Sequence, residues 1–138
     1  MAQIDYQYAG KDNPYFCNEA GRVEFTIGTE AADVIRVTAA LKRPRVGLGV
    51  GKRLAVVAYL STDAEGDNIT SSAPDGGVVV GNKGVVIPLV AGKAFQLITN
   101  ASGEVNIDIT ESTAKTFYLI IVLPTGETVA SGAITFAA

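Results

Sequence analysis

Two segments in the second half of the chain differ in how apolar and polar residues follow one another. Residues 104–110 alternate strictly, which places Val105, Ile107 and Ile109 on one face of a strand and polar residues on the other. Residues 117–123 form an unbroken apolar run, which is typical of a strand that is buried on both faces. The first strand needs one covering layer. The second also needs a further layer, a chain arm or another subunit over its second face.

Strand patterns recur along the rest of the chain, and turn residues separate them. We expect strands at residues 23–27, 33–42, 54–60, 78–80, 85–90, 94–99, 104–110, 116–123 and 127–136. Residues 81–84 (Gly-Asn-Lys-Gly) predict a hairpin turn between two of these strands, and Pro124-Thr125-Gly126 predicts another. Because no segment has a convincing helical pattern, we predict an all-β fold, an immunoglobulin-like Greek-key β-sandwich over residues 23–138.

Residues 1–22 depart from this pattern, and we interpret them as an irregular N-terminal arm. The arm has no clean hydrophobic period and is interrupted by turn residues. It nevertheless holds four of the ten aromatic residues of the chain, Tyr6, Tyr8, Tyr15 and Phe16. So many aromatic side chains in an irregular segment indicate an arm that packs on a surface, either of its own domain or of a neighbouring subunit. We take these four residues as candidate protein contacts.

The composition describes one folded domain with few groups suited to catalysis. With 138 residues, 48% apolar and 18% charged, the chain is long and apolar enough to bury a core. It contains no His, which removes Ser-His-Asp and Cys-His catalysis and the commonest zinc sites. A single cysteine, Cys17, allows no intrachain disulfide, and we interpret it as an inert thiol. We therefore expect no enzymatic activity, no cofactor and no metal site.

Charge and hydropathy also restrict the partners that we expect. A net charge of −3 argues against a general nucleic-acid-binding surface. The longest apolar run is far shorter than the roughly 20 residues of a membrane helix. The first residues lack the basic and apolar regions of a secretory signal. We expect neither a nucleic-acid nor a membrane partner, and we expect synthesis in a cytosol.

A basic segment at residues 42–53 contains five of the eleven cations of the chain. Its glycines resemble a phosphate-binding loop, but Val46 stands where that loop needs Gly, and Arg53 stands where it needs Ser or Thr. Arg43-Pro44-Arg45 holds two guanidinium groups apart on a stiff backbone, which suits carboxylate partners. A solvated loop, a contact with an acidic protein surface and a nucleic-acid contact remain open. We take four residues as candidate contacts: Arg43, Arg45, Lys52 and Arg53.

An acidic segment contains Asp63, Glu65 and Asp67 around a glycine. Counted from Asp63, an EF-hand loop would need Gly and Glu where Asn68 and Pro74 stand, so the segment does not match. A polar turn and a calcium site of another kind remain as interpretations.

Several ordered blocks carry a resemblance to a known family. They are VAYLSTDAEGD at residues 57–67, APDGG at 73–77, IPLVAGKAFQL at 87–97, LPTGE at 123–127 and SGAITF at 131–136. Together they resemble small structural proteins of tailed bacteriophages that have an immunoglobulin-like fold. The resemblance covers roughly residues 33–137 and rests on strand and turn residues.

The resemblance implies a non-enzymatic virion protein, either a capsid decoration protein or a minor capsid protein. It implies the major capsid protein as partner, assembly as a homotrimer, and a place on the outer capsid surface after synthesis in the host bacterial cytoplasm. A tail or baseplate component with the same fold is the main alternative. A carbohydrate-binding surface module is another, although the chain has no Trp to form a sugar platform.

Overall fold

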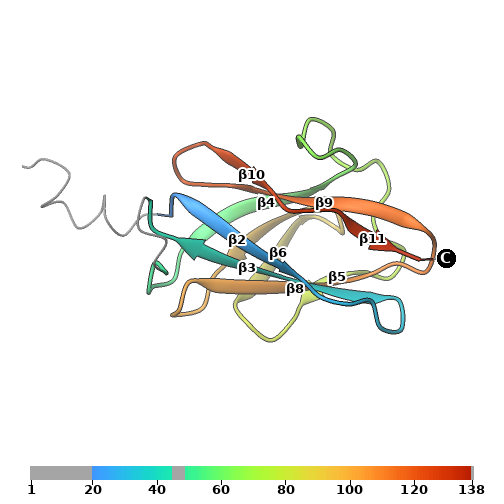
Figure 1. Ribbon diagram of the computed structural model, residues 1–138, viewed down its shortest axis with the longest axis horizontal. Helices are drawn as coiled ribbons and strands as arrows, with labels where there is room; N and C mark the ends of the chain where they lie inside the picture. Colours follow the sequence, from blue (N-terminus) through green and yellow to red (C-terminus); the bar gives the residue numbers. More distant parts are fainter. Residues whose placement is uncertain (1–19, 45–48, 138) are drawn as a thin grey trace, which may run out of the picture.

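The computed structural model describes residues 20–44 and 49–137 (Figure 1). These residues form only strands and connecting loops, without a helix. The strands are β2 (Arg22–Ile27), β3 (Val34–Lys42), β4 (Ala55–Ser61), β5 (Gly77–Val80), β6 (Val85–Val90), β7 (Ala94–Ile98), β8 (Glu104–Thr110), β9 (Lys115–Val122), β10 (Thr128–Ala130) and β11 (Ile134–Phe136). The all-β prediction is confirmed.

The strands form two antiparallel sheets that pack face to face (Figure 1). The larger sheet has the order β10-β9-β4-β7-β6, and β11 also pairs with β9. The smaller sheet has the order β2-β3-β8-β5. The smaller sheet corresponds to the ABED sheet of an immunoglobulin domain, and β10-β9-β4 corresponds to GFC. Strands β6 and β7, which lie between β5 and β8 in the chain, extend the larger sheet beside β4. The fold is therefore a β-sandwich, as the strand pattern predicted.

The core lies between the inner faces of the two sheets and follows the period of two. In β8, Val105, Ile107 and Ile109 are each at most 1% exposed, as their alternation predicted. Opposite them, Phe95, Leu97 and other apolar residues of the larger sheet are equally buried. One hydrophobic cluster thus spans both sheets.

The predicted hairpin at residues 81–84 is wrong. Strand β5 pairs with β8 in the smaller sheet, whereas β6 pairs with β7 in the larger sheet, so these residues cross from one sheet to the other. Gly84 has a φ of +81°, and a Cβ there would lie 2.5 Å from the Ile98 carbonyl oxygen. Turn composition indicated correctly that the chain changes direction, but it does not determine which strands become neighbours.

The final predicted strand, residues 127–136, is divided into β10 and β11, which pair with different parts of β9. Between them, the Ser131 hydroxyl accepts a hydrogen bond from the Leu119 N–H at 2.9 Å. The predicted hairpin at Pro124-Thr125-Gly126 is confirmed, because β9 and β10 are adjacent and Val122 lies opposite Thr128.

Candidate protein-contact surfaces

The end of the sandwich where β2 begins and β3 ends holds the basic segment (Figure 1). The Gly21 N–H donates to the Lys42 carbonyl oxygen at 2.9 Å, so the arm enters the domain beside the start of this segment. Gly21 packs so closely on Pro44 that a Cβ would lie 2.7 Å from the proline ring. At the other end of the segment, the Val50 N–H donates a hydrogen bond to the Leu41 carbonyl oxygen at 3.3 Å. Sheet pairing therefore brings residues 20–22 together with the two described parts of the basic segment, residues 42–44 and 49–53, and we call this region the basic end.

The predicted contact residues are only partly described by the structure. Tyr6, Tyr8, Tyr15, Phe16 and Arg45 lie outside the described residues. Lys52 and Arg53 are exposed and Arg43 is half-buried. The guanidinium groups of Arg43 and Arg53 donate long hydrogen bonds, each 3.4 Å, to the backbone oxygens of Gly49 and Thr99.

Three cations of the basic end, Arg43, Lys52 and Arg53, have no acidic partner within residues 20–44 and 49–137, whereas Lys42 at the start of the segment pairs with Glu24 at 3.6 Å. The ion pairs of that part of the chain involve Arg36, Lys42, Lys83 and Lys115 instead. The structure thus brings three of the predicted contact residues to one end without neutralising their charge, which suits an anionic partner surface.

The second face of the apolar strand β9 is covered in part by the domain itself. Ile120 points away from the core between the sheets and is nevertheless fully buried. A Cβ on Gly66 would lie 3.0 Å from the Ile120 side chain, so the loop after β4 lies over it. The Tyr59 hydroxyl donates to the Gly66 carbonyl oxygen at 2.7 Å and holds that loop in place. Neither the arm nor another subunit is needed to cover Ile120.

The acidic segment forms this covering loop. Oδ1 of Asp63 accepts hydrogen bonds from the N–H groups of Gly66 at 2.6 Å and Asp67 at 2.9 Å, and Oδ2 accepts one from the Asn68 amide at 2.7 Å. These bonds, the one from Asp67 foremost, lower the pKa of the Asp63 carboxyl. The described residues contain no group of three potential metal ligands. The hydrogen bonds that the Asp63 carboxylate accepts therefore stabilise a polar turn.

Beyond Ile120, the outer face of the larger sheet is open and apolar. The sheet register places Val57 of β4, Gln96 of β7 and Ile87 of β6 in one row across this face. The large exposed residues Val57, Val85, Ile87, Leu89 and Val90, which we call the apolar face, are 41–57% exposed. The outward positions of β4 and β7, which lie among them, carry Ala55, Val57, Tyr59, Ala94, Gln96 and Ile98. No charged side chain occupies these positions.

Two more exposed apolar residues lie on β5, and the register places one of them, Val79, on the outer face of the smaller sheet opposite Asp108. Val79 and Val80 of β5, the neighbouring edge of the smaller sheet, are 59% and 39% exposed. Strand β6 contains Pro88, and its pairing with β7 is irregular between Pro88 and Val90. The apolar face was not among the predicted contact surfaces. The apolar run at residues 85–90 could have indicated it, but such a run is typical of a strand buried on both faces, and only the structure shows that β6 lies at the edge of a sheet.

The outer face of the smaller sheet is charged and its polar groups are paired. Arg36 of β3 forms two hydrogen bonds with Asp108 of β8, from Nε to Oδ1 at 2.7 Å and from Nη2 to Oδ2 at 2.9 Å. The hydrogen bond from Arg36 lowers the pKa of the Asp108 carboxyl, although partial burial opposes this effect. Lys83 forms an ion pair with Glu104 at 2.7 Å. This face therefore pairs several of its own charges and remains solvated.

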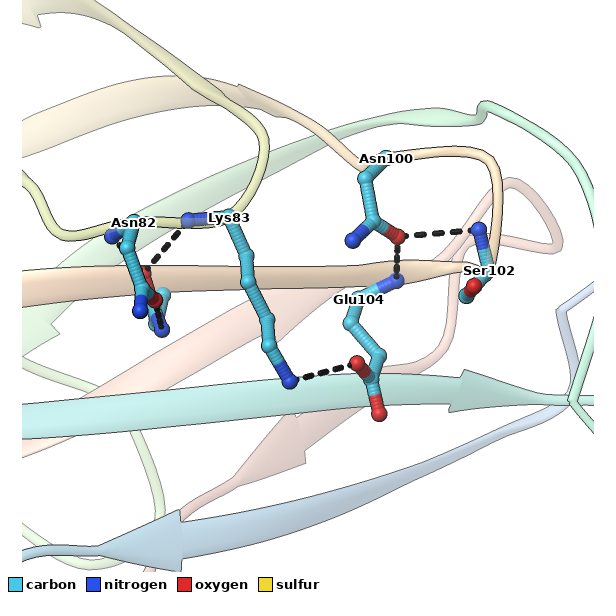
Figure 2. A network of polar contacts seen from close by, with 6 residues as sticks. Asn82, Lys83, Asn100, Ser102 and Glu104 are labelled. Atoms are coloured by element: carbon cyan, nitrogen blue, oxygen red, sulfur yellow. Dashed lines mark hydrogen bonds and ion pairs between the residues drawn. The ribbon is translucent and has the colours of Figure 1, made fainter.

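Two asparagines anchor the neighbouring loops to β8 (Figure 2). Oδ1 of the buried Asn106 accepts hydrogen bonds from the N–H groups of Asn82 at 2.8 Å and Lys83 at 3.1 Å. Oδ1 of Asn100 accepts hydrogen bonds from the N–H groups of Ser102 at 2.9 Å and Glu104 at 3.0 Å. Asn106 thus fixes the crossing between β5 and β6, and with it the corner beside the apolar face.

In comparisons with known proteins, the chain matches no protein-family model, and no curated protein matches it significantly. A search of the described residues for a helix long and apolar enough to cross a membrane finds none.

Proposed function

We propose that this protein is a non-enzymatic virion structural protein that binds the outside of a bacteriophage capsid and stabilises it. The observation that carries the proposal is the basic end, where three cations lie beside Gly21, the point at which the arm enters the domain, and lack acidic partners among the described residues. The resemblance to small structural proteins of tailed bacteriophages supplies the class of partner, the major capsid protein.

The proposed mechanism is stabilisation by binding. A protein that bridges neighbouring capsid subunits makes contacts that exist only in the assembled shell, so binding shifts the equilibrium towards assembly by mass action. The arm provides aromatic area for such a contact, and Arg43, Lys52 and Arg53 provide charge for an acidic surface. In this proposal the contact falls on the basic end, and the resemblance implies three copies at each site.

Binding of purified protein to expanded capsids tests the proposal. The full chain should co-sediment with shells, and removal of residues 1–16 should abolish this binding. Normal decoration by the truncated protein would refute the role of the arm. Protein found on virion tails by labelled electron microscopy would replace the capsid with a tail or baseplate site.

The contribution of the cations can be tested separately by reversing their charge. Lys52→Glu combined with Arg53→Glu should weaken shell binding at least tenfold, and the loss should shrink at high salt because screening removes it. Lys93→Glu is the matched control for each of the two single reversals, since Lys93 lies in the turn before β7, at the other end of the sandwich. Equal losses in both proteins would argue against a specific role of the basic end.

A further inference from the structure

The apolar face is a large surface that the described domain leaves uncovered. We propose that it is a contact surface between copies of this chain. The inference goes beyond capsid binding and does not depend on it, because the apolar face and the basic end are different surfaces.

Charge is the first argument for a second copy as the occupant. The chain carries a net charge of −3, so two copies repel each other over most of their surfaces. The apolar face lacks charged side chains at the outward positions of β4 and β7 and can meet an identical face without opposing like charges. A self-complementary patch of this kind is what an isologous contact between identical subunits requires.

The distribution of apolar side chains is the second argument. Within residues 20–44 and 49–137, the large exposed apolar residues are the five of the apolar face, Val79 and Val80 beside it, and Ile69. The described surface therefore offers no second apolar patch of similar size that could receive this face. The best complement that the chain provides is the same surface on another copy.

The area and the strand edge fit this contact as well. The five residues expose on the order of 400 Å², which is within the range of the largest apolar patch on a typical monomer, a patch that is often functional, and is about half the area per partner in a standard interface before flanking residues are added. Strand β6 is poorly suited to pairing edge to edge, because Pro88 lacks an N–H and the ladder is irregular beside it. Association through side chains of the face is the favoured geometry.

The test measures the mass of the purified full chain by sedimentation equilibrium between about 1 and about 200 μM. We expect a mass above one chain that falls on dilution. Ile87→Glu and Val57→Glu should each weaken association at least tenfold, because each would bury a carboxylate in the contact. Thr26→Glu, an exposed position of β2 in the other sheet, is the control and should associate normally.

Thermal melting of each variant checks that it folds, and because the two sites lie on different strands, either folded variant decides the test. Three results would overturn the proposal. The first is association that survives in the folded face variants. The second is a monomer at every concentration that binds the apolar dye ANS, which would leave the face for another partner. The third is a monomer that does not bind the dye, which would indicate that residues 1–19 of the same chain cover the face. The first two results do not bear on shell binding, and co-sedimentation with shells measures that binding directly in every case, so the two proposals fail separately.

Discussion

The outer faces of the two sheets belong to one sandwich but have opposite chemistry. On the smaller sheet, outward positions carry ion pairs between neighbouring strands, Arg36 with Asp108 and Lys42 with Glu24. On the larger sheet, the outward positions in the row of Val57 and Ile87 carry no charge at all. The polar residues of the smaller sheet's outer face are suited to contact with water. The apolar residues of the larger sheet's outer face instead require a covering layer. One part is covered by the loop at Gly66, and we propose a second copy for the rest.

The largest expected effect is a loss of stability, and it distinguishes the covered part of the larger sheet's outer face from its exposed part. Ile120→Ala should lower the free energy of unfolding by about 2–4 kcal/mol, because it removes a fully buried side chain and leaves a cavity under the loop. Urea denaturation measures this change.

The matched control for Ile120→Ala is Val57→Ala, in which an exposed residue of the same face is shortened. It should cost less than about 1 kcal/mol, since it buries little in the single chain. Equal costs would mean that the loop does not cover Ile120 in solution.

A smaller effect is expected at Asn106, a buried polar residue on the outer face of the smaller sheet. Asn106→Ala should lower the free energy of unfolding by about 1–3 kcal/mol, because the N–H groups of Asn82 and Lys83 lose their acceptor in a buried setting. Thr26→Ala, on the same face but exposed, should change it by less than about 0.5 kcal/mol. Hydrogen exchange should also show faster opening of residues 81–84 in the Asn106 variant, and unchanged exchange would contradict the anchoring role.

The smallest expected effect is on how the stability of the protein depends on pH in the acidic range. The pKa of the Asp108 carboxyl is lowered in the folded state, so the stability that it contributes is present above the unfolded pKa of about 3.9 and is lost as pH falls through the folded pKa. Asp108→Asn should therefore flatten the decline of the urea midpoint at acidic pH. The decline should not vanish, because the pKa of Asp63 is lowered as well.

The control for Asp108→Asn is Thr128→Asn at an exposed position of β10, which removes no titratable group and should leave the decline unchanged. A variant of Asp108 with the same acid profile as the wild type would show that the pair with Arg36 contributes nothing measurable.

Part of the contact surface could be predicted from sequence alone. Arg43, Lys52 and Arg53 lie within a dozen residues of one another, so their gathering at one end follows from chain proximity. The entry of the chain beside them at residues 20–22 depends on the pairing of Arg22 with Lys42, which composition does not reveal. The apolar face was missed because its members come from β4 and β6, which are separated by about 30 residues and joined only through β7.

The sequence by itself determined the fold class and the inward side of the alternating strands. A period of two allows only one way to bury Val105, Ile107 and Ile109, so local pattern and core agree. The tertiary structure alone decided that residues 81–84 cross between sheets and that a polar turn covers Ile120. The physical reason is that strand neighbours and loop packing depend on contacts between distant residues, whereas the pattern of a single strand records only which of its faces avoid water.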